Sequence, residues 1–331
     1  MPQRLDFNGL CDFVNEHKGD KCLITFHSIG DRDAVGTAIP LSKYFDDAVV
    51  ATPDYITNNA RYMIEKVGYG RNIDPKFRDD AKLIIVLDTN TLESVGSFKE
   101  KIEGSSAQLL FIDHHLLTEP ENRAAIFNDE SFNSTASIVY DVLKKLGQRI
   151  DKESSILLLN GIISDSAEFK NATSETFMQI SELLEDAKTT YPEVMAYFHN
   201  PITLNNRYYL IHDLYASTVE ITGNYLVVYG QANSHANIAA DMAIQTGADF
   251  SIFWSVNEKE ASLSARLRPP LDTKLHIHLG KILHDTASYI DGNGGGHPCA
   301  AGAYGPNRDM INEAVGYVLK QIKQIFSEAR K

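Results

Sequence analysis

Three short apolar runs in the first 112 residues, at 22–26, 83–87 and 108–112, each lead directly into acidic or histidine residues. The polar residues that follow these runs are His27, Asp88 and the triplet Asp113-His114-His115. Short apolar runs that alternate with helical periodicity are typical of buried strands in a parallel sheet. The carboxyl ends of such strands meet at one edge of the sheet, where open α/β sheets bind ligands. The pattern therefore predicts an α/β fold with one site built from three strand ends.

Length, charge and cysteine content narrow the class of protein. A chain of 331 residues fits two domains of common size. No apolar run reaches membrane-spanning length, and Asp6 interrupts any secretory signal, so we expect a cytoplasmic protein without membrane contact. The three cysteines form no CxxC pair, which argues against a zinc knuckle. A net charge of -13 argues against coating of long duplex nucleic acid, but it permits a small phosphate ligand.

The first domain, residues 1–188, is predicted to be a doubly wound parallel sheet with helices on both faces. Its predicted strands are 21–26, 48–51, 82–87 and 108–112, and its predicted helices are 6–18, 33–45, 55–67 and 134–146, with a buried apolar segment at 153–164. Asn133 is the expected N-cap of the helix at 134–146. Weak periodicity with Pro192 and Pro201 predicts a linker at 189–206.

The second domain, residues 207–331, is predicted to be a smaller mixed-sheet α/β domain, with a cleft between the two domains. Gly223-Asn224 is a tight-turn signal between its first two strands. The predicted strands are 217–222, 225–230, 249–255 and 260–267, and the predicted helices are 235–246, 273–285 and 308–328.

The acidic residues after the first two runs are candidate metal ligands. Asp31 and Asp33 precede a helix, and His27 adds a nitrogen donor at the strand end. Alternatively, the two aspartates only favour the helix N-terminus, through capping and the helix dipole. Asp88 is either a ligand or an ordinary turn residue.

The triplet and Asp165 complete the candidate set. Adjacent histidines after a strand point in different directions, so we expect one of His114 and His115 to bind metal and the other to face substrate. Both could instead be polar loop residues. Asp165 follows the apolar segment 156–163, and a carboxylate there needs a partner, either a hydrogen-bond donor or a cation.

The charges of this set agree with two divalent ions. Four aspartates bring -4 and two divalent ions bring +4, while neutral His27 and His114 add nothing; the four aspartates are Asp31, Asp33, Asp88 and Asp165. Mixed histidine and aspartate ligation favours Mn²⁺, with Mg²⁺ or Co²⁺ as alternatives. Two such ions suit in-line attack of a bridging hydroxide at phosphorus.

Two segments near the C-terminus suggest a substrate contact. Gly294, Gly295 and Gly296 before His297 let the backbone approach a phosphate closely, although a surface turn is the alternative. Residues 262–268 are a predicted strand, in which every second side chain lies on the same face. That face would carry Ser264, Arg266 and Arg268, whose guanidinium groups could clamp a phosphate. Solvated charges on an edge strand are an equally good interpretation.

Together these motifs resemble the RecJ-like DHH family of phosphoesterases over nearly the whole chain. The matching residues are His27, Asp31, Asp33, Ala34 and Gly36; Asp88; Asp113-His114-His115; Gly161 to Asp165 with Phe169 and Thr173; and Gly294 to His297 with Ala300 to Gly302. The last group resembles the DHH-associated C-terminal domain. One departure is Gly30-Asp31-Arg32-Asp33, where members commonly have Pro-Asp-Gly-Asp, so that Arg32 adds a bulky cation beside the ligands.

The resemblance implies a role for each residue. His27, Asp31 and Asp88 would hold one Mn²⁺, and Asp33, Asp88, His114 and Asp165 the other. His115 would face the scissile phosphate, with Asp113 orienting its neighbours. Substrate would be bound by Ser264, Arg266, Gly294, Gly295, Gly296 and His297.

The implied activity is hydrolysis of very short single-stranded RNA or DNA, or of small nucleotides such as 3′-phosphoadenosine 5′-phosphate and linear dinucleotides. An inorganic pyrophosphatase or exopolyphosphatase is one alternative, and a non-catalytic nucleotide-binding or replication-scaffold protein is another. The Gly-Gly-Gly-His signature argues against the pyrophosphatase, and the complete ligand set argues against the scaffold. A homodimer is compatible with the sequence.

Overall fold

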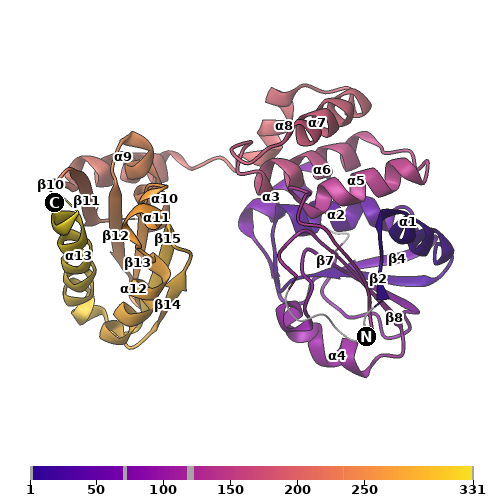
Figure 1. Cartoon of the computed structure of the whole chain (residues 1–331), viewed down its shortest axis with the longest axis horizontal. Helices are drawn as coiled ribbons and strands as arrows, with labels where there is room; N and C mark the ends of the chain where they lie inside the picture. The colour runs from indigo at the N-terminus through magenta and orange to yellow at the C-terminus, as the bar shows by residue number, and fades with distance from the viewer. Residues whose placement is uncertain (1–2, 70–72, 118–122, 234, 330–331) are drawn as a thin grey trace. The chain divides into compact units, whose positions relative to one another are not determined.

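The computed structural model, which describes residues 3–69, 73–117, 123–233 and 235–329, divides the chain into two compact units, Met1–Asn200 and Pro201–Lys331 (Figure 1). The predicted architecture, a parallel sheet with helices followed by a mixed-sheet α/β domain, is confirmed. The segment 189–206, predicted as a linker, holds α8 (Tyr191–Phe198) and the first residues of α9 (Leu204–Ala216). Among the described helices, none is long and apolar enough to cross a membrane.

The sheet of the first unit contains seven strands, and every described pairing in it is parallel. Their spatial order is β1 (Gln3–Arg4), β9 (Ala125–Asn128), β8 (Gln108–Asp113), β7 (Leu83–Leu87), β2 (Lys21–Phe26), β4 (Asp47–Ala51) and β6 (Ile73–Asp74). Side chains alternate between two cores, so that Ile85 packs on one face of the sheet while Ile84 and Val86 pack on the other. Continuous burial of this kind explains why the central strands read as unbroken apolar runs.

Helices cover both faces of this sheet (Figure 1). One face carries α1 (Phe7–Glu16), α2 (Arg32–Ser42), α3 (Asn58–Val67) and α5 (Thr135–Lys145). The opposite face carries η1 (Leu92–Phe98) and α4 (Lys99–Gly104). The apolar helix α6 (Lys152–Asp165) packs on α2 and α5 and is covered in turn by α7 (Ser174–Ala187) and α8.

Two predicted helix starts are wrong for local reasons. The N-cap of α5 is Ser134, whose hydroxyl accepts a hydrogen bond from the Ser137 N–H at 3.0 Å, while the Asn133 side chain bonds to α7 instead. Helix α3 begins at Asn58, because β5 (Tyr55–Ile56) pairs with β3 (Ile29–Gly30) in a small second sheet.

The second unit is built on a six-stranded sheet in which only β11 and β12 pair in parallel among the described strands. The order is β10 (Thr218–Thr222), β11 (Tyr225–Gln231), β12 (Phe250–Val256), β13 (Ala261–Leu267), β15 (Ala300–Gly305) and β14 (Asn293–Gly296). Helices α9 and α10 (Ala236–Thr246) pack on one face. The other face carries α12 (Leu279–Thr286), η2 (Ala287–Ile290) and α13 (Ile311–Glu328).

The glycine-rich segment is a strand rather than the loop that the sequence suggested. Residues Asn293–Gly296 form β14, which pairs antiparallel with β15. A Cβ atom at Gly294 would lie 2.2 Å from the Leu283 carbonyl oxygen, so the glycine lets α12 pack directly on the strand. The predicted helix at 273–285 is also two helices, α11 (Leu271–Leu275) and α12, because His276 adopts a left-handed conformation between them.

Candidate metal centre

Asp88 lies at the centre of the side chains that gather at the carboxyl ends of β2, β7 and β8. It follows β7 directly, is 4% exposed and has a left-handed backbone with φ of 60°. Its Oδ2 lies 3.2 Å from His27 Nε2, and its Oδ1 lies 3.6 Å from His114 Nε2. The Thr135 hydroxyl donates to Oδ1 at 3.0 Å. One carboxylate therefore faces histidines from two neighbouring strands.

The two aspartates of the first loop have different environments. Asp31 caps α2, since its Oδ1 accepts the Ala34 N–H at 3.1 Å, and the same oxygen lies 3.8 Å from His27 Nε2. Asp33 is fully buried and accepts the N–H groups of Thr135 and Ala136 at 2.7 and 2.9 Å. The two aspartates can therefore serve helix N-termini and still be candidate metal ligands. Asp31 caps its own helix, α2, whereas Asp33 lies at the N-terminus of α5.

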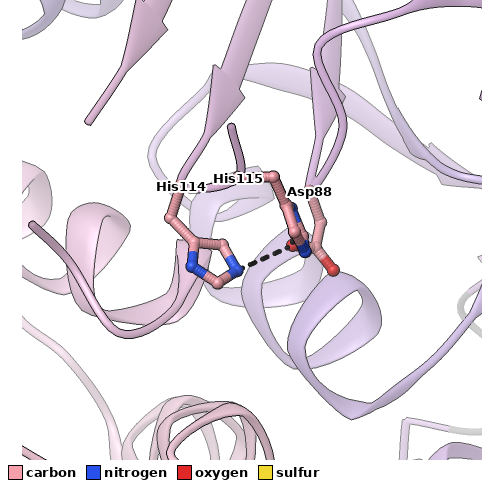
Figure 2. Close-up of side chains that lie close together, drawn as sticks. All are labelled: Asp88, His114 and His115. Atoms are coloured by element: carbon pink, nitrogen blue, oxygen red, sulfur yellow. Dashed lines mark ion pairs between the residues drawn. The ribbon is translucent and has the colours of Figure 1, made fainter. Parts of the chain in front are cut away.

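The triplet at the end of β8 consists of the carboxylate of Asp113, which is the last residue of the strand, and the imidazoles of His114 and His115. Asp113 is fully buried, and its Oδ2 accepts the Asn90 side-chain N–H at 2.6 Å. Its Oδ1 accepts the His115 Nδ1–H at 2.8 Å. Figure 2 shows His114 and His115 side by side, with His114 directed at Asp88. Asp113 therefore holds the Nδ1 edge of the His115 ring.

His114 Nε2 is the atom whose surroundings most clearly fit a metal ion. It is buried and has no hydrogen-bond partner, although carboxylate oxygens of Asp88 and Asp165 lie 3.6 and 3.3 Å away. A buried polar atom without a partner is costly, and binding to a metal ion would satisfy it. Asp165, the last residue of α6, brings a further carboxylate to the site.

Among the described residues, two overlapping sets of potential ligand atoms meet at Asp88. The first set is His27, Asp31 and Asp88, and the second is Asp33, Asp88, His114 and Asp165; within each set the ligand atoms lie within 4.8 Å of one another. A third set of potential ligands is Asp88, His114 and His115. We favour the first two sets because Nδ1 of His115 is already hydrogen-bonded to Asp113.

The pKa values reflect this crowding of charge. Burial, Asp165 and Asp88 raise the pKa of Asp33, and burial also raises the pKa of Asp165. Burial alone would raise the pKa of Asp88, but the adjacent imidazoles of His114 and His27 hold it below its usual value. Against the opposing effect of burial, the carboxylates raise the pKa of His27 to about 10 and of His114 to about 11. The positive charge of the protonated imidazoles thus offsets the negative charge of the aspartates. Divalent cations could supply the same positive charge.

A pocket of about 520 Å³ opens onto these residues. Its lining comprises His27, Ser28, Ile29, Asp31, Asp88, Thr89, Asn90, Thr91, Ser94, Asp113, His115, Leu116 and Asp165. No lysine or arginine is among these lining residues. Asn90 and Thr135 were not predicted from the sequence; the only available signal for Asn90 was its place two residues after Asp88.

Arg32 lies outside this lining, although it stands between two candidate ligands. Its guanidinium packs over the Phe198 ring, 4.0 Å from the centroid, and donates to the Phe198 carbonyl oxygen. The departure from the family motif therefore fastens the end of α8 to the start of α2.

The residues predicted to bind substrate all belong to the second unit. Ser264, Gly294 and Gly295 line a pocket of about 600 Å³ within that unit, and no lysine or arginine lines it in the part of the chain that the structure describes. Arg266 lies beside it, with Nε 2.6 Å from Asp241 Oδ1 and one Nη 3.1 Å from Ser264 Oγ. Gly296 and His297 are not part of the lining, and Arg268 donates to the carbonyl oxygens of Gly247 and Ala248.

Comparison with known protein families gives a match in each unit. The model for the DHH family, N-terminal domain, matches residues 21–162, and the DHHA1 domain model matches residues 222–328. An uncharacterized protein of Methanocaldococcus jannaschii is 24% identical over 95% of this chain and 98% of its own length. The bifunctional oligoribonuclease and PAP phosphatase NrnA of Bacillus subtilis is 24% identical over 68% of this chain and 70% of its own length.

Other similarities concern metal-dependent relatives and the fold. A manganese-dependent inorganic pyrophosphatase of Methanothrix thermoacetophila is 28% identical over 46% of this chain and 50% of its own length. An exopolyphosphatase-related protein from Bacteroides fragilis superposes with a TM-score of 0.75 at 18% identity, covering 98% of this chain and 96% of that one. RecJ from Thermus thermophilus in complex with Mn²⁺ gives a TM-score of 0.51 at 12% identity, covering 97% of this chain and 55% of that one.

Proposed function

Because this chain belongs to the DHH family of phosphoesterases and carries a DHHA1 domain, we propose that it is a Mn²⁺-dependent phosphodiesterase acting on very short oligonucleotides or small nucleotides. The observation that carries this proposal is the Asp88 carboxylate, which belongs to both sets of candidate ligands. A carboxylate shared between two divalent ions is the arrangement expected for displacement at phosphorus.

In the proposed site, His27, Asp31 and Asp88 would hold one ion, and Asp33, Asp88, His114 and Asp165 would hold the other. When bound, the two ions supply an activated water and charge stabilisation for the phosphoryl oxygens. Asp113 accepts the Nδ1–H of His115, so that in the doubly protonated imidazolium form the Nε2–H of this pocket-lining ring is free to donate to a phosphoryl oxygen. The hydrogen bond with Asp113 raises the pKa of His115, which favours the protonated imidazolium ring.

The charge of the two pockets supports a nucleotide substrate over an inorganic polyphosphate. Pyrophosphate is a compact polyanion and would be expected to need several cationic side chains. Among the described residues, neither pocket lining includes lysine or arginine, whereas the hydroxyl groups and backbone of the second pocket suit a ribose or a base. We assign substrate contacts to Ser264, Gly294 and Gly295, and to Arg266, Gly296 and His297 beside the pocket.

The test is hydrolysis of labelled RNAs of two to five nucleotides beside a 30-mer, with Mn²⁺ present. We expect mononucleotides to be released from the short substrates and little digestion of the 30-mer. Preferential digestion of the 30-mer would contradict the proposal. 3′-Phosphoadenosine 5′-phosphate serves as a second substrate in the same assay.

A pyrophosphatase is the second candidate, because the manganese-dependent pyrophosphatase of Methanothrix thermoacetophila matches part of this chain. Phosphate release from pyrophosphate, measured under the same conditions, separates the two. Faster turnover of pyrophosphate than of dinucleotides would favour the second candidate.

A further inference from the structure

The second unit exposes a row of large apolar side chains on α9. Leu204, Tyr208, Ile211 and Tyr215 are between 63 and 89% exposed. They follow one another at intervals of four, three and four residues, so they form a single stripe along the helix. Exposed apolar residues are ordinary when they are scattered, but a contiguous stripe of this size calls for a partner.

The strand that follows α9 continues this apolar surface. Val219 and Ile221 of β10 are 61 and 74% exposed. Val219 pairs with Val228, and Val228 packs with Leu210 of α9, so Val219 and Ile221 lie on the sheet face that carries α9. Strand β10 is the last strand on its side of the described sheet, and natural proteins rarely leave an apolar edge strand uncovered.

The stripe lies on the flank of α9 that faces away from α10. On the other flank, Asn206 lies 2.9 Å from His235 at the start of α10, and Asp213 accepts the Asn233 N–H at 2.9 Å. Helix α9 packs on β11 while α10 packs mainly on β12 and β13, and β10 lies on the other side of β11. The stripe and β10 are therefore both on the side of α9 opposite α10. We call these six residues the α9–β10 surface.

We propose that the α9–β10 surface binds a second copy of this chain across a twofold axis. Six large side chains exposed to this degree offer on the order of 900 Å², close to the ~800 Å² that each partner contributes to a standard interface. None of the six residues is charged, so two copies can meet there although each chain carries a net charge of -13. A nucleic-acid partner would require cations within the surface.

The test is the mass of the full chain in solution, measured by light scattering and sedimentation over a wide range of concentrations. We expect twice the 36.8 kDa of one chain for the natural protein. Tyr215→Lys and Ile221→Lys each place a charge in the surface and should lower the mass to that of one chain. Met178→Lys is the control, because Met178 is a large apolar residue that is 58% exposed on α7, outside the α9–β10 surface, and its replacement should leave the dimer intact.

Circular dichroism of each variant separates loss of the dimer from loss of the fold. Tyr215 is 89% exposed, so its replacement disturbs no core, and Leu204→Lys provides an independent variant at the other end of the stripe. A natural protein that stays monomeric at every concentration would overturn the proposal. So would folded Tyr215→Lys and Ile221→Lys variants that remain dimeric. These masses do not depend on catalysis, so the result is independent of the proposed function.

Discussion

Asp88 combines two features that a protein rarely keeps without a functional reason: a left-handed backbone and a buried carboxylate. Its N–H donates to the Ile112 carbonyl oxygen at 3.0 Å, and the Thr135 hydroxyl binds its side chain. These contacts hold the strained residue so that its two oxygens face His27 and His114. The strain is therefore part of how the carboxylate is directed.

We predict that Asp88→Asn and Asp88→Ala both abolish turnover, by about a thousandfold or more, because a carboxylate bridge to two ions is worth several kcal/mol in the transition state. Asn tolerates the left-handed conformation, so Asp88→Asn should keep the stability of the natural protein better than Asp88→Ala. Initial rates with Mn²⁺ and thermal unfolding measure the two effects. Asp79→Ala, at an exposed aspartate of the same unit, is the control and should be normal. Near-normal turnover of Asp88→Asn would refute the metal assignment.

Metal binding should also release protons. Without metal, the pKa values of about 10 and 11 keep His27 and His114 protonated at neutral pH, and a metal ion needs both imidazoles neutral. Affinity for Mn²⁺ should therefore rise as the pH rises from about 6 to 8. Titration calorimetry in two buffers with different heats of ionisation measures the protons released. A binding heat that is the same in both buffers would contradict this coupling.

At the scale of secondary structure, the sequence predicted the polar residues at the strand ends better than it predicted the contacts that hold them in place. His27, Asp88 and His114 were predictable because each follows an apolar run, and parallel strands end at one edge. The two N–H groups that bind Asp33 belong to α5, about a hundred residues away, and no local pattern indicates them. Strand β14 was missed because glycine has low strand propensity, and its pairing with β15 depends on the tertiary contact with α12.

The packing of α6 against α2 gives a prediction for a helix interior. A Cβ atom at Gly161 would lie 2.7 Å from Asp33 Oδ1 and 2.9 Å from the Ala136 Cβ. Gly161→Ala should therefore push α6 away from the site, destabilise the protein by about 1–3 kcal/mol and weaken Mn²⁺ binding. Urea unfolding and metal titration measure both effects.

Gly316 of α13 is the matched control for that substitution. Nothing lies within 4 Å of a Cβ atom placed there, so Gly316→Ala should stabilise its helix by up to about 1 kcal/mol, as alanine does in a helix interior. If Gly161→Ala were also neutral or stabilising, the close approach of α6 to Asp33 would not be a constraint on the site.

At the scale of the whole molecule, the two units have separate hydrophobic cores, and all candidate metal ligands lie in the first. An ion that binds only the folded first unit stabilises that unit by about 2.7 kcal/mol when its concentration is a hundred times the Kd. The chain's single tryptophan, Trp254, lies on β12 of the second unit and so reports the unfolding of that unit. We predict that Mn²⁺ raises the midpoint of the calorimetric transition of the first unit and leaves the midpoint of the Trp254 fluorescence transition unchanged. Chelation should return the first transition to its original temperature. An equal shift of both midpoints would instead mean that the two cores unfold as one cooperative unit.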